Sequence, residues 1–73
     1  MKHASFEELQ TFRLIVDMRR VVDILNGDIA DEETRCGVLD RTGPEYPMRA
    51  RALIARRDNL ESTIASLEKR VGP

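Results

Sequence analysis

The sequence predicts an all-α protein, a coiled-coil-like antiparallel hairpin of two helices that dimerises into a four-helix bundle. Two stretches, Thr11 to Cys36 and Tyr46 to Val71, carry apolar residues at alternating spacings of three and four. This is the spacing of heptad positions a and d, which line the contact between two helices packed lengthwise. We therefore expect a single domain over residues 1–73, with helix one at about 5–36, a loop at about 37–46 and helix two at about 47–71.

The first helix has clear start and stop signals. Ser5-Phe6-Glu7-Glu8 matches a capping box, in which the Ser5 hydroxyl accepts a hydrogen bond from the Glu8 N–H and the Glu8 carboxylate accepts one from the Ser5 N–H. Gly37 is expected to end the helix, because glycine readily adopts the left-handed conformation found at that position. The a/d positions between these signals are Thr11, Ile15, Met18, Val22, Leu25, Ile29, Glu32 and Cys36.

The dipeptide Asn26-Gly27 could break this helix. An interior glycine costs about 1 kcal/mol, and Asn-Gly is a common turn signal. The a/d spacing nevertheless passes from Leu25 to Ile29 without a change of phase. We expect one continuous helix, and the sequence does not decide whether it bends at the dipeptide.

The second helix begins near Pro47, because proline suits the first turn of a helix, where its missing N–H would be unpaired anyway. Two registers bring its a/d positions level with those of the first helix. One places Glu32 opposite Arg57 as a core ion pair, and the other places Leu25 opposite Arg57. Pairing the two charges favours the first register slightly, and the sequence leaves both open. The a/d positions of this helix are Tyr46, Ala50, Leu53, Arg57, Leu60, Ile64, Leu67 and Val71.

Self-association is expected because so short a chain has little core of its own. A domain of this size buries only about 60% of the surface of its unfolded chain, and such scaffolds usually need a disulfide, a metal or a partner. The single cysteine, Cys36, excludes an intrachain disulfide, and we expect it to be a small core residue at the end of the first helix. With the lone His3, to which we assign no role, it makes no metal site.

The first helix carries more apolar surface than the second can cover, which indicates an interface. We expect a homodimer, and a different helical protein would also cover this surface. The expected interface residues are Phe12, Leu14, Ile15, Met18, Val21, Val22 and Leu25.

A cluster of arginines on the second helix suggests an alternative, a nucleic-acid-associated regulator. Its residues would be Arg49, Arg51, Arg56 and Arg57. The net charge of −1 provides no long-range attraction for nucleic acid, and an acidic stretch on the first helix faces the cluster in either register. Pairing within the chain is therefore the stronger interpretation, and we expect no nucleic-acid partner.

No enzyme, metal or cofactor signature is found. Neighbouring carboxylates such as Glu32 and Glu33 point in different directions on a helix and do not converge on a pocket. The longest apolar run, Leu14 to Val16, is far too short to span a membrane. We expect a non-catalytic cytoplasmic protein–protein interaction or assembly module without cofactors. The remote alternative is a small all-helical dimeric enzyme.

Overall fold

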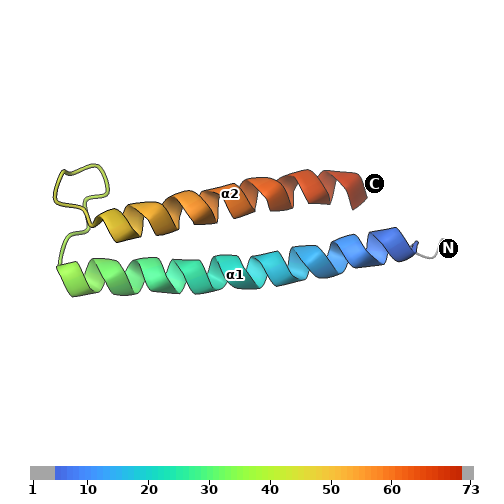
Figure 1. Ribbon diagram of the computed structural model, residues 1–73, viewed down its shortest axis with the longest axis horizontal. Coiled ribbons are helices and arrows are strands. Elements are labelled where there is room, and N and C mark those ends of the chain that lie inside the picture. The colour runs from blue at the N-terminus through green and yellow to red at the C-terminus, as the bar shows by residue number, and fades with distance from the viewer. Residues whose placement is uncertain (1–4, 72–73) are drawn as a thin grey trace.

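The computed structural model describes residues 5–71 and consists of two helices joined by a loop (Figure 1). Helix α1 spans Phe6–Cys36 and helix α2 spans Met48–Val71. The helices lie antiparallel and side by side, with the loop at one end and both chain ends at the other. The described residues contain no strand, and the predicted all-helical hairpin is confirmed.

Helix α1 begins and ends at the predicted signals. The Ser5 hydroxyl accepts from the Glu8 N–H at 3.1 Å, and the Glu8 carboxylate accepts from the Ser5 N–H at 3.2 Å. At the other end Gly37 has φ 71°, and its N–H donates to the Glu33 carbonyl at 2.8 Å. Residue His3 lies outside the described part of the chain.

Helix α1 is continuous through Asn26-Gly27. The residues on either side of the dipeptide, Leu25 and Ile29, are 5% and 1% exposed, because both pack against α2. This packing outweighs the weak helix propensity of the dipeptide, as tertiary contacts usually do for a cost of about 1 kcal/mol.

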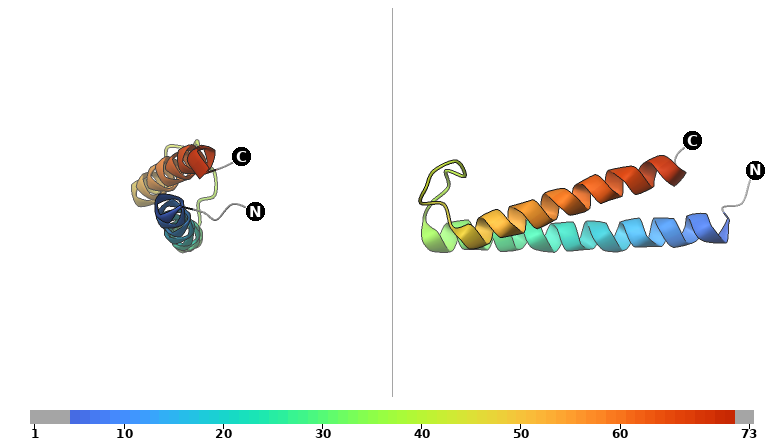
Figure 2. Two further views of the ribbon diagram at one scale, coloured as in Figure 1. Left: turned by 90° about the vertical axis from the view of Figure 1, so that its right-hand side faces the viewer. Right: turned by 45° about the horizontal axis from the view of Figure 1, so that its top comes forward.

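The core of the hairpin is a narrow row along the line where the helices meet. Ala50, the smallest core side chain, is fully buried and allows close approach near the loop. From there the helices incline away from each other toward the open end (Figure 2). The buried apolar residues are Ile15, Leu25, Ile29, Tyr46, Ala50 and Ile64.

The register differs from the one that the sequence slightly favours. The Arg57 guanidinium donates to the side chain of Asn26 at 3.0 Å, which places Arg57 beside Leu25 rather than opposite Glu32. The Glu32 carboxylate is instead paired with Arg35, one turn along α1. The expected Glu32–Arg57 ion pair is therefore not formed, because each charge has a nearer partner.

Tyr46 is buried, as its a/d position predicts, and it lies at the end of the loop, since α2 begins at Met48. One residue lies elsewhere than the heptad pattern predicts. Cys36 is exposed and is not a core residue. The register explains this, because the Asn26–Arg57 contact places Cys36 level with the end of the loop rather than with a turn of α2. No helix within residues 5–71 has the length and apolar character needed to cross a membrane.

Two glycines, one inside α1 and one at its end, allow a matched test of the backbone conformation. Gly27→Ala should raise the free energy of unfolding by about 1 kcal/mol, because Gly27 is helical and an added Cβ meets open space. Gly37→Ala should lower it by about 1 kcal/mol, because φ at Gly37 is positive. Both are measured by urea unfolding followed by circular dichroism at one protein concentration. A destabilising Gly27→Ala would show that α1 is not helical at that point.

Candidate interaction surface

The predicted interface residues are divided by the fold among several places. Ile15 and Leu25 are buried between α1 and α2 and are therefore unavailable to a partner. Phe12 is 43% exposed and lies seven residues before Arg19, on the same side of α1 as that arginine. Val22 lines a groove on that side, described below. The other three, Leu14, Met18 and Val21, lie together on the opposite side of the hairpin.

These three residues form one half of a surface that we call the leucine face, and residues of α2 form the other half. Its residues recur every three, four or seven positions, so each set lies along one side of its helix. All are incompletely buried, and Leu14 is 48% exposed. The leucine face consists of Leu14, Met18 and Val21 from α1 and Leu53, Leu60 and Leu67 from α2.

The two halves share one side of the hairpin because of its antiparallel geometry. Antiparallel helices place equivalent heptad positions on the same side of their contact. Arg19 pairs with Glu68, and Asn26 bonds to Arg57, on the other side. The sequence predicts the α1 half of the leucine face, but not the α2 half. The α2 leucines occupy a/d positions, and only the structure shows that α1 leaves them partly uncovered.

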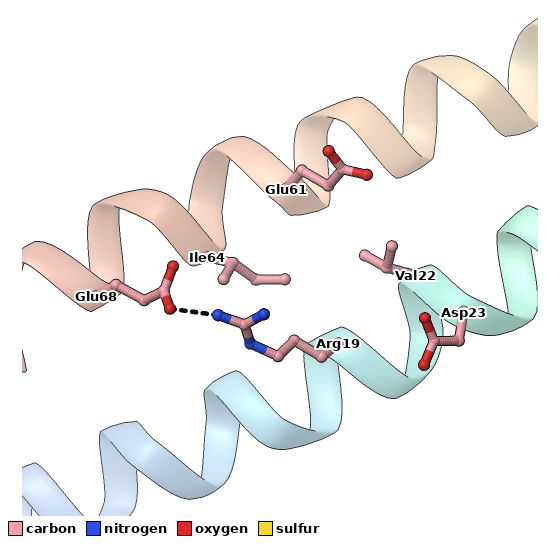
Figure 3. A pocket seen from close by; sticks show the side chains of 6 residues that line it. All are labelled: Arg19, Val22, Asp23, Glu61, Ile64 and Glu68. Carbon is pink, nitrogen blue, oxygen red and sulfur yellow. Dashed lines mark hydrogen bonds and ion pairs between the residues drawn. The ribbon is translucent and has the colours of Figure 1, made fainter.

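An open groove of about 380 Å³ lies on the other side of the hairpin, between the diverging helices (Figure 3). Val22 and Ile64 point into it, and the Arg19–Glu68 ion pair spans one end. Asp23 and Glu61 complete a charged rim. Ligand pockets are usually enclosed and mainly apolar with a few convergent polar groups, and this groove has the opposite character. Its exposed ion pair contributes little to stability.

A polar network holds the loop against the end of α1. The Glu33 carboxylate is 8% exposed and accepts from the Tyr46 hydroxyl at 2.7 Å and from the Arg41 Nε at 2.9 Å. The bond from Arg41, followed by that from Tyr46, lowers the pKa of Glu33. Burial raises the pKa of Tyr46. The ring of Tyr46 also packs under the Arg51 guanidinium, whose carbon lies 5.4 Å from the ring centre.

The loop contains a tight turn as well. The Asp40 carboxylate accepts from the Thr42 N–H at 3.0 Å and from the Thr42 hydroxyl at 2.7 Å, and the hydroxyl bond is the main cause that lowers the pKa of Asp40. The Asp40 carbonyl accepts from the Gly43 N–H at 3.2 Å. Such turns are typical of Asp followed by small polar residues. The loop is therefore ordered by its own side chains.

The arginine cluster of α2 is partly engaged within the chain. Arg51 donates to the Gly43 carbonyl at 2.6 Å, and Arg57 bonds to Asn26 and Asp58. Arg49 lies near enough to Glu32 to help lower the pKa of that carboxyl, although the hydrogen bond from Arg35 is the larger cause. Of the four cluster residues, Arg51 and Arg57 have defined partners that a nucleic acid would have to replace.

No group of three metal-ligating side chains lies together among residues 5–71. Comparison of the chain with protein-family models, with curated proteins and with solved structures gives no match.

The Glu33 network predicts how stability depends on pH. Folding lowers the pKa of Glu33 below its ordinary 4.5, so its ionised form stabilises the fold above that pH, and this stabilisation is lost as the pH falls through the lowered pKa. Glu33→Gln should therefore reduce the loss of unfolding free energy between about pH 5 and about pH 3. It should not abolish the loss, because Arg35 lowers the pKa of Glu32 too.

Urea unfolding at the two pH values measures this difference. Glu45→Gln, which neutralises an exposed loop carboxylate outside the network, is the control and should behave as the unaltered protein. An identical pH dependence in Glu33→Gln and in the unaltered protein would contradict the role given to Glu33.

Proposed function

We propose that this hairpin is a non-catalytic module for protein–protein interaction or assembly, which dimerises into a four-helix bundle through its leucine face. The observation that supports this most directly is the row of incompletely buried apolar side chains along both helices, Leu14, Met18, Val21, Leu53, Leu60 and Leu67. In a single hairpin these side chains keep contact with water on one side. A second layer of helices would cover them.

The composition of α1 supports the same proposal. Large apolar residues are exposed along α1 beyond the side that α2 covers, and Leu14 among them lies on the leucine face. Exposed apolar patches on a protein surface commonly mark contacts with another protein. These exposed residues are Phe6, Leu9, Phe12, Leu14, Val16 and Ile24.

A second copy is the partner that we propose, rather than a helical protein of different sequence. Each copy carries the leucine face, and a two-fold axis lets the same surface serve on both sides of the contact. The hairpin itself buries few side chains, and small scaffolds commonly gain their missing core by oligomerisation. A cytoplasmic location belongs to the same proposal, because the single thiol of Cys36 resembles the cysteine usage of reducing compartments.

The alternative of a nucleic-acid-associated regulator is not developed further. The bonds made by Arg51 and Arg57 within the chain give it no support.

Leu14→Glu tests the proposed interface. Leu14 is 48% exposed, so the substitution should leave the hairpin folded, but it would place a charge in the dry contact between copies. Sedimentation equilibrium should give about twice 8.3 kDa, or 16.6 kDa, for the unaltered protein and 8.3 kDa for Leu14→Glu.

Met48→Glu is the matched control, since Met48 is 84% exposed and lies outside the leucine face. It should leave the mass of the dimer unchanged. A monomeric unaltered protein, or a Leu14→Glu protein that stays dimeric at the same concentration, would refute the proposal.

A further inference from the structure

We infer that the two copies stack crosswise, with α1 of one copy against α2 of the other, about a two-fold axis parallel to the helices. This inference rests on the proposed dimerisation through the leucine face and adds which helices meet there. The inference is argued from the charged residues along the two borders of the leucine face.

The α2 border of the leucine face is basic. Residues on this border are seven positions apart, and each lies three or four residues from a leucine of the face, so they form a row beside the leucines. All four are exposed, and three are arginines. The row consists of Arg49, Arg56, Thr63 and Arg70.

The α1 border is acidic where it runs beside the apolar residues. Asp17 lies three residues after Leu14 and four before Val21, and Asp28 lies seven after Val21. Both aspartates are exposed. Farther along the helix, the charge of Arg35 is neutralised by its ion pair with Glu32.

Two ways of stacking the leucine faces differ in what these borders meet. If α2 packs on α2 of the partner, the arginine row faces an identical arginine row. If α1 packs on α2 of the partner, aspartates face arginines on both sides of the bundle. Like charges placed opposite each other at an interface disfavour that arrangement, and opposite charges favour and orient the other.

The levels of the charges along the hairpin agree with the crosswise arrangement. A two-fold axis parallel to the helices keeps every residue at its own height. The Asn26–Arg57 contact places Asp28 close to the height of Arg56. In the same register Asp17 is level with about residue 66, roughly 6 Å along the axis from Arg70 at 1.5 Å per residue. Asp28 of each copy is therefore level with Arg56 of the other, which gives one opposite-charge pair on each side of the bundle.

The crosswise arrangement makes every neighbouring pair of helices antiparallel, as the alternative arrangement does, so the charges decide between the two. Within a copy α1 and α2 are already antiparallel. Across the interface α1 then meets an α2 that runs in the opposite direction, as in up-down-up-down four-helix bundles. The two α1 helices lie diagonally across the bundle and do not touch along their length.

Cross-linking between chains that each carry one cysteine distinguishes the two arrangements. Val21 and Thr63 both border the gap between the copies, and the register of the Asn26–Arg57 contact places them close to the same height. Cys36→Ser removes the native thiol, which is exposed. Val21→Cys and Thr63→Cys are then made in separate chains, one of them isotope-labelled, and the chains are mixed, refolded together and treated with a short bis-maleimide.

Intact mass spectrometry should find the cross-link almost entirely between a Val21→Cys chain and a Thr63→Cys chain. Ser62→Cys, an exposed position outside the leucine face, is the control and should not cross-link to Val21→Cys. Cross-links mainly between two Val21→Cys chains and between two Thr63→Cys chains would overturn the crosswise arrangement and leave the dimer standing. A chain that sediments as a monomer and gives no cross-link would overturn both.

Discussion

The buried carboxylate of Glu33 determines how the two helices can meet. A charge at this depth is stable only when it is paired and hydrogen-bonded, and Arg41 and Tyr46 provide both. Both partners belong to the loop, so satisfying Glu33 folds the loop back onto the last turn of α1. Helix α2 must then begin at Met48, close to the level of Glu33. The register of the whole hairpin follows from that starting point.

The register in turn decides which charges are level with each other. In the observed register Asp28 is close to the level of Arg56, as the Asn26–Arg57 contact shows. A shift by one heptad, which would place Glu32 opposite Arg57, would bring Arg35 level with Arg56 instead. The leucines of α2 would still lie along one side, because they repeat every seven residues. The shift would therefore keep the apolar surface and lose the electrostatic match.

Local signals allowed much of this fold to be predicted from the sequence. The capping box at Ser5 and the left-handed glycine at Gly37 depend on a few neighbouring residues, and both form as expected. The register could not be predicted, because the a/d pattern repeats identically after seven residues and the decisive bonds of Glu33 come from the loop. The exposed half of the candidate interface, Leu53, Leu60 and Leu67, also needed the structure, because a/d positions do not reveal how completely one partner helix covers them.

In the proposed dimer, folding and association are coupled, because the hairpin alone has so narrow a core. Ile29 and Ala50 are almost completely buried by the contact of α1 with α2 alone, so the central row requires no second copy. Each residue of the leucine face keeps water contact in the single hairpin, and in the proposed dimer a second copy covers it. A partner that binds only the folded chain stabilises it by mass action, so the stability of this hairpin should rise with its own concentration. The same apolar row that stays in contact with water in the isolated chain would form the contact between copies in an assembly.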